Sequence, residues 1–213
     1  MQGRSDSLAV GAAGAVASAY GVLAGLGGIT HGIGETLQGN VAPSGVVINS
    51  WTQGPIATNL GGEPGMTIVP NLFVTGVLTL IVSSALLIWA AALVQRKNGG
   101  LVVILLSITM LLVGGGFAPP IVGILAGIAG LGINAPLTWW RRHLSASARH
   151  LSAKLWPWVF GVSVVNGVFL VVGSVTLVYF AGLNDPGLFT NSFLFAVLSS
   201  PLTIVTALAH DIQ

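Results

Sequence analysis

Long stretches without a charged residue constrain this chain more than any other feature of its sequence. Five of these stretches are also largely apolar, namely 8–34, 64–95, 98–140, 155–184 and 186–210. A helix of about 20 apolar residues crosses the hydrocarbon core of a bilayer, and an uncharged run of about 18 is already a candidate. We therefore predict an all-α fold, a polytopic integral membrane helix bundle that forms a single transmembrane domain over residues 1–213.

The composition excludes several other classes of protein. Hydrophobic residues make up 54% of the chain and charged residues only 6%, whereas soluble proteins average about 25% charged residues. A soluble enzyme is therefore excluded. The absence of cysteine excludes a disulfide scaffold and thiol redox chemistry. A net charge of +2 is too small to form a surface for nucleic acid, so no nucleic-acid partner is expected.

The third uncharged stretch is too long for one crossing, and its middle contains a break. Gly114, Gly115 and Gly116 precede Pro119 and Pro120, a combination that favours a turn. The sequence thus predicts about six spans, over about 8–34, 69–94, 101–117, 120–137, 157–182 and 190–210. The third and fourth are short, roughly 26 Å each, and a re-entrant hairpin is the alternative for this pair.

The positions of lysine and arginine predict the orientation of the bundle. With six spans, all seven basic residues fall on one side, namely Arg4, Arg96, Lys97, Arg141, Arg142, Arg149 and Lys154. Cytoplasmic loops retain lysine and arginine, so we expect a cell-membrane protein with both termini in the cytoplasm. Ala15, Val16 and Ala17 resemble a signal-peptide cleavage site, but the apolar run continues well beyond them, and we expect no cleavage.

Two segments between the spans are predicted to lie outside the hydrocarbon core. The outer loop 35–68 is rich in Gly, Pro, Asn and Thr and is longer than an ordinary connection, which favours a functional or partner-contacting loop. Residues 139–156 form a predicted cytoplasmic interfacial amphipathic helix. A docking site for a cytosolic partner is the alternative to contact with anionic lipid headgroups. The basic residues concerned are Arg141, Arg142, Arg149 and Lys154.

Small residues recur every three or four positions along the first and fourth predicted helices. The members of these faces include Gly14, Ser18, Gly21, Gly25, Gly28 and Gly32 on the first helix, and Gly123, Gly127 and Gly130 on the fourth. Such faces allow helices to approach closely in lipid. We expect these two helices to form a tight pair, within the chain or between the protomers of a homo- or hetero-oligomer.

Hydroxyl and amide side chains form a second kind of stripe on the second and sixth predicted helices. Its members are Asn71, Thr75, Thr79, Ser199, Thr203 and Thr206. Side chains of this type hydrogen-bond neighbouring helices or line a path for a neutral solute. Both interpretations stay open at the level of sequence.

His31 and Glu35 are the only candidate pair for metal or proton chemistry. Four residues apart, they project from one face of the first predicted helix. Either Glu63 or Asp185, from the outer loops, could complete a metal site with them. The plain alternative is that both side chains cap the helix end in water. The sequence indicates no particular cofactor.

Three functions follow as hypotheses. The first is a non-catalytic, close-packed subunit or scaffold of a membrane assembly, because small-residue faces are long and no hydrolase, zinc-protease or phosphate-loop motif is present. The second is a carrier or channel for a small neutral solute, with the hydroxyl stripes facing the path. The third is a lipid-acting membrane enzyme, which requires His31, Glu35, Asn71 and Asp185 to meet in one outer pocket.

Overall fold

The computed structural model describes residues 11–213, so Arg4 and the start of the first predicted span lie outside the described residues. Nearly all of the described chain that has regular structure is helical, as predicted. The elements are α1 (Ala12–Leu37), β1 (Val47–Asn49), α2 (Gly54–Asn59), β2 (Pro64–Met66), α3 (Leu72–Ala92), α4 (Gly99–Leu112), α5 (Ala118–Gly132), α6 (Thr138–His143), α7 (Ala146–Val168), the π-helical η1 (Phe169–Gly173), α8 (Ser174–Ala181) and α9 (Pro186–Asp211).

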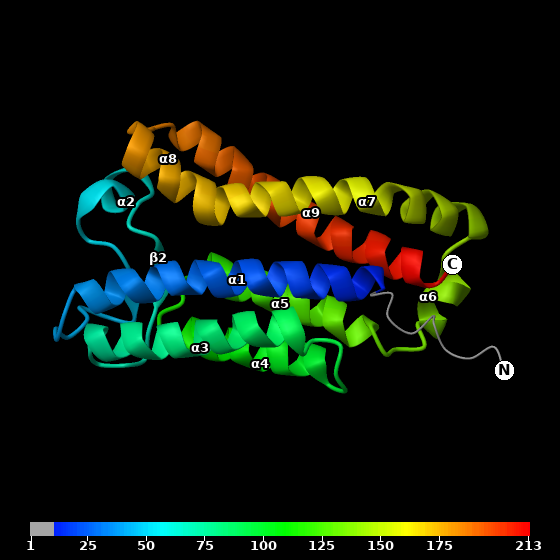
Figure 1. Cartoon of the computed structure of the whole chain (residues 1–213), viewed down its shortest axis with the longest axis horizontal. Coiled ribbons are helices and arrows are strands. Elements are labelled where there is room, and N and C mark those ends of the chain that lie inside the picture. The colour runs from blue at the N-terminus through cyan, green and yellow to red at the C-terminus, as the bar shows by residue number, and fades with distance from the viewer. Residues whose placement is uncertain (1–10) are drawn as a thin grey trace.

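The long helices lie side by side along one axis, and α1 runs through the middle of the bundle (Figure 1). One group, formed by α3, α4 and α5, packs on α1 from one side, and the layer of α7, α8 and α9 lies on the other side. The start of α1, α6 and the C-terminus share one end, which we call the basic end. The opposite end, covered by residues 38–71, is called the capped end.

Four helical segments are long and apolar enough to cross a membrane, namely Ala12–Leu37, Leu72–Ala92, Ala146–Phe180 and Pro186–Asp211. The two shorter apolar helices, α4 and α5, lie on either side of the break predicted from the glycines and prolines. Pro119 and Pro120 lie in the first turn of α5, where the missing N–H of proline costs no helical hydrogen bond. The architecture is compatible with a multi-pass membrane protein.

The outer surface of the helices is apolar, as lipid contact requires. Ile81 of α3, Phe180 of α8 and Leu198 of α9 are 60%, 89% and 74% exposed. Apolar side chains so widely exposed would form unusually large patches on a protein in water. In a bilayer the same surface is in its preferred solvent, since a spanning helix satisfies its own backbone.

The loop predicted at 35–68 folds into a cap over one end of the bundle. α1 continues through Leu37, and β1 pairs with β2 in a short antiparallel ladder. The cap is joined to the α4–α5 hairpin by a bridge between Thr67 and Val113 and by a hydrogen bond from Ile68 N–H to the carbonyl of Leu112 (3.0 Å). The turn at 114–116 is consequently buried beneath the cap.

The glycine face of α1 packs against α3. A Cβ added at Gly25 would lie 2.9 Å from the carbonyl oxygen of Ser83 and 3.0 Å from the Cα of Leu87. A Cβ added at Gly32 would lie 3.0 Å from the carbonyl oxygen of Gly76. The remaining members of the face are buried, apart from half-buried Ser18; they are Gly14, Gly21 and Gly28. The positions of these residues match close helix contact within the chain.

The glycines of α5 pack mainly against α4 rather than against α1. A Cβ added at Gly127 would lie 2.7 Å from the carbonyl oxygen of Gly100, and one at Gly130 would lie 2.8 Å from the Cα of Gly100; Gly123 faces Ser107. The predicted contact between these two helices is formed, since α1 packs against α5, but their glycine faces do not meet each other. The two helices contact each other through Gly27 and Pro119. The glycine face of α1 thus packs mainly against α3, and the glycine face of α5 packs mainly against α4.

The segment predicted as one interfacial helix over 139–156 is divided. α6 ends at His143, and α7 begins at Ala146 and continues through Pro157 into the long helical segment that ends at Phe180. Ser145 caps α7 by accepting a hydrogen bond from the N–H of Ala148 (3.2 Å), which explains the break. Within residues 11–213, the basic side chains of this region form no ion pair with a carboxylate.

Candidate functional site

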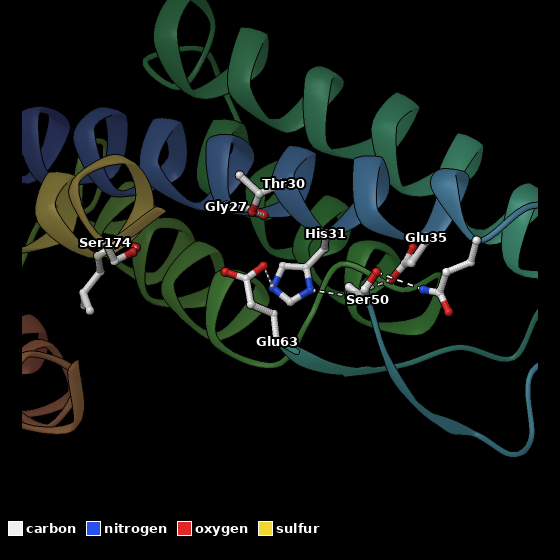
Figure 2. A network of polar contacts seen from close by, with 9 residues as sticks. Gly27, Thr30, His31, Glu35, Ser50, Glu63 and Ser174 are labelled. Atoms are coloured by element: carbon white, nitrogen blue, oxygen red, sulfur yellow. Dashed lines mark hydrogen bonds and ion pairs between the residues drawn. The ribbon is translucent and has the colours of Figure 1, made fainter. Parts of the chain in front are cut away.

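A chain of buried polar side chains lies where α1 meets the cap (Figure 2). His31 is 5% exposed and Glu35 is fully buried. Between them lies the hydroxyl of Ser50, which is 2.7 Å from His31 Nδ1 and donates to Glu35 Oε1 at 3.0 Å. The other carboxyl oxygen of Glu35 accepts from Thr79 (3.2 Å). The sequence-based alternative that His31 and Glu35 cap a helix end in water is therefore wrong.

Glu63 reaches the opposite side of the His31 ring from the cap. Its Oε2 atom lies 3.7 Å from His31 Nε2, is buried, and has no hydrogen-bond partner within the described residues. Burial raises the pKa of Glu63 to about 7. The residue has a left-handed backbone with φ of 51° and directly follows Gly61 and Gly62, which are also left-handed. Such a conformation is costly for a residue with a Cβ, and it is typical of functional positions.

The glycines of the 114–116 turn fit closely around the same cluster. A Cβ added at Gly114 would lie 2.5 Å from Glu35 Oε2, and one added at Gly116 would collide with the imidazole of His31. Both glycines have positive φ, 118° and 76°. The turn therefore requires glycine for two reasons, the backbone conformation and the space taken by His31 and Glu35.

His31 and Glu63 form the polar end of a largely apolar cavity of about 570 Å³. The cavity lies between α1, α5 and the layer of α7, η1, α8 and α9. Its apolar wall includes Leu23, Ile121, Leu125, Leu170, Phe193 and Val197. The π-helical turn η1 contributes to this wall, and such turns are frequent at functional sites. The volume lies in the usual range for small-molecule sites.

The hydroxyl groups that line the cavity are already hydrogen-bonded within the protein. Tyr20 pairs with Ser163 at 2.6 Å, and Ser163 pairs with Ser199 at 3.1 Å. The hydroxyls of Thr30, Ser174 and Ser200 donate to carbonyls of their own helices. The polar atoms left to interact with a ligand are thus concentrated at His31 and Glu63.

The six residues of the predicted polar path do not line the cavity, although Ser199 lies behind it and pairs with Ser163. Thr75 and Thr79 are fully buried near the cap, where Thr75 pairs with Thr67 at 3.0 Å. Thr203 and Thr206 donate to carbonyls of α9, and Asn71 caps α3 by accepting from the N–H of Val74. None of the six is among the residues that line the cavity. Their positions match helix contacts and caps, and a path through them stays a prediction.

The metal site predicted at His31 and Glu35 is not assembled as a ligand set. Among residues 11–213 no group of three or more His, Cys, Asp or Glu side chains is placed to hold a metal ion. Asp185 caps α9 by accepting from the N–H of Leu188 (3.0 Å). Asn71 is also a helix cap, and neither Asn71 nor Asp185 nor Glu35 is among the residues that line the cavity with His31.

Two members of the site were not prominent in the sequence. Ser50 lies in a loop whose only signal is its turn-rich composition. Glu63 stands out only because so few acidic residues are present. The further signal is its position directly after two glycines, since consecutive left-handed residues can turn a side chain back toward the bundle. The pairing of Glu63 with His31 depends on the fold of the whole cap.

The fold and the apolar surface are those of an α-helical protein, and they are compatible with multi-pass insertion in a membrane. The sequence matches no protein-family model, and no curated protein and no solved structure is similar to it. The site itself therefore carries the functional argument.

Proposed function

We propose that this protein binds a small, membrane-soluble amphiphile in the cavity between α1, α5 and α9. The observation that carries the proposal is an apolar chamber of about 570 Å³ with its free polar atoms gathered at one end, at His31 and Glu63. A well-formed apolar cavity with a few convergent polar groups is the usual form of a small-molecule site. An apolar body would fill the chamber, and a polar head would lie at His31.

The rim of the cavity favours entry from the lipid. Ile121 of α5 and Phe193 and Val197 of α9 line the cavity and are 54%, 45% and 52% exposed. The cavity wall and the lipid-facing surface are therefore continuous between α5 and α9. A ligand dissolved in the bilayer could reach the site by this route without crossing water. Binding, carriage across the membrane and presentation to a partner protein all begin with this step.

The site supports this function better than a scaffold held together by glycine faces. The face of α1 is covered by α3, and the face of α5 by α4. These contacts occupy, within the chain, the glycine faces that favoured the scaffold hypothesis. A role as subunit of a larger assembly would have to use another surface.

The proposed orientation places the capped end outside and the basic end in the cytoplasm. Arg96 and Lys97 lie in the α3–α4 connection at the basic end, and the basic residues of α6 and α7 lie at the same end (Figure 1). This follows the positive-inside rule. We infer that anionic lipid headgroups contact the exposed side chains there, namely Arg141, Arg142, Lys154 and half-buried Arg149. The cysteine-free chain allows a direct test, because a membrane-impermeant maleimide on intact cells should label Gly45→Cys and spare Ser147→Cys.

The binding proposal is tested with radiolabelled dodecanol and the protein in lipid nanodiscs. Dodecanol should bind saturably, above its partition into empty nanodiscs. Ala196→Phe places a ring in the cavity, where Ala196 is half-buried, and should abolish saturable binding. Ala91→Phe introduces the same ring at an exposed position of α3 and is the matched control, expected to bind as the unaltered protein does. Equal binding by both variants would contradict the proposal.

A further inference from the structure

Two hydrogen-bond acceptors, His31 Nε2 and Glu63 Oε2, face each other at the polar end of the cavity. When the Glu35 carboxylate is ionised, its Oε1 accepts the single hydroxyl proton of Ser50 (3.0 Å), and His31 Nδ1 then donates to the oxygen of Ser50 (2.7 Å). A neutral imidazole with its proton on Nδ1 carries a lone pair on Nε2. That atom faces Glu63 Oε2 at 3.7 Å, and a carboxylate oxygen is also an acceptor.

No side chain of the described residues forms a hydrogen bond with Glu63 Oε2, although the buried indole N–H of Trp51, itself without a partner, lies close to this carboxyl group. Glu63 Oε2 is buried without a hydrogen-bond partner. The ionisable side chains that line the cavity are Tyr20, His31 and Glu63, and no lysine or arginine is among the lining residues. Glu35 lies behind Ser50 and accepts hydrogen bonds itself. The polar end of the chamber is therefore rich in acceptors and lacks a positive charge.

A buried acceptor without a partner is costly, and a buried carboxylate more so. The chain also holds Glu63 in a left-handed conformation that a residue with a Cβ rarely adopts. Both costs are incurred at one residue, which points into a chamber large enough for a small molecule. A donor supplied by a ligand would offset the first cost.

We propose that the ligand is a lipophilic primary amine, whose ammonium group donates to both Glu63 Oε2 and His31 Nε2 while its alkyl body lies in the apolar chamber. This inference rests on the proposed function of the cavity and specifies its substrate class. An ammonium group has three donors and a positive charge, so it can satisfy both atoms at once. An alcohol has one proton and can satisfy only one of them. A carboxylate would add a third acceptor to the cluster.

Three probes with the same alkyl chain separate these cases, namely dodecylamine, dodecanol and dodecanoate. Affinities are measured in nanodiscs of neutral lipid at about pH 8, where the amine is charged. Dodecylamine should bind at least about tenfold more tightly than dodecanol, as expected for a charge-assisted hydrogen bond. Dodecanoate should bind more weakly than dodecanol. Equal affinity for the amine and the alcohol would overturn the inference while leaving the cavity proposal intact.

Substitutions at Glu63 complete the test. Glu63→Gln should remove the preference for dodecylamine over dodecanol, because the amide lacks the charge. Glu63→Gly should also remove the preference for dodecylamine. Because glycine fits the backbone conformation, this variant provides the test if the glutamine variant folds poorly. Asp185→Asn is the matched control, since it removes another carboxylate near the capped end and asparagine also caps helices. A preference that survives both Glu63 substitutions would overturn the inference.

Discussion

The carboxylate of Asp211 closes the first turn of α1, although the two are separated by almost the whole chain. Its oxygens accept hydrogen bonds from the N–H groups of Ala12 (2.7 Å) and Ala13 (2.8 Å). The first N–H groups of a helix have no partner within the helix, and a negative charge is favourable at that position. This contact joins α9 to α1 at the basic end, and the polar cavity end lies near the opposite end of α1.

Asp211→Ala should therefore destabilise the protein by about 1–2 kcal/mol, the usual loss for a helix cap. The measurement is thermal or denaturant unfolding in detergent. Asp211→Asn should recover part of the loss, because the amide oxygen can still accept one bond. Gln213→Ala, at a nearby exposed position, is the control. No loss in Asp211→Ala would contradict the assigned contact.

A second prediction concerns the contact of α1 with α3. Gly25→Ala should destabilise the protein by about 1–3 kcal/mol, because its Cβ would meet backbone atoms of Ser83 and Leu87, which cannot rotate away. Gly161→Ala is the matched control. It lies in α7 with nothing within 4 Å of an added Cβ, so alanine should be neutral or should stabilise the helix by about 0.5–1 kcal/mol. Similar effects of the two substitutions on unfolding would contradict the packing.

The left-handed backbone at Glu63 predicts an unusual order of stabilities. Glu63→Gly should be more stable than Glu63→Gln by about 1 kcal/mol, because glycine adopts a φ of 51° at little cost and glutamine does not. Both variants lack the carboxylate, so its loss does not contribute to the difference. The check is the difference in midpoint and free energy of unfolding. A glycine variant less stable than the glutamine variant would show that Glu63 is not strained.

The raised pKa of Glu63 predicts a fall of stability with rising pH. Its pKa is about 7 in the folded protein against an ordinary value of 4.5, so the folded state holds the proton more tightly than the unfolded state does. The contribution of Glu63 is complete below about pH 4.5 and is lost as pH rises toward 7. The free energy of unfolding of the unaltered protein, minus that of Glu63→Gln, should fall between these values by at most about 1.4 kcal/mol per pH unit. A rise over the same range would contradict the burial of this carboxyl.

Much of the fold could be predicted from the sequence because hydrocarbon allows few solutions. Uncharged runs locate the helices, and the break at 114–116 marks the α4–α5 turn, since only glycine tolerates its backbone. The partner of each glycine face could not be predicted. A face of small residues indicates that some helix packs closely against it, but it does not indicate which helix.

The site was only partly visible in the sequence for a related reason. His31 and Glu35 stand out because ionisable residues are rare in this chain, and their helical spacing places them on one face. Ser50 and Glu63 come from the cap, whose course depends on left-handed turns and on its contact with the α4–α5 hairpin. The cavity itself arises from the distance between two helix layers, which no local pattern encodes.

The most direct test of the central claim is photo-cross-linking with a diazirine-bearing dodecanol, followed by mapping of the labelled residues. The account predicts that label concentrates on cavity residues such as Ile121, Phe193 and Val197, that excess dodecanol removes it, and that Ala196→Phe abolishes it. Label spread evenly over lipid-facing positions such as Ile81 and Leu105, and unaffected by competitor, would contradict the existence of a binding site in this cavity.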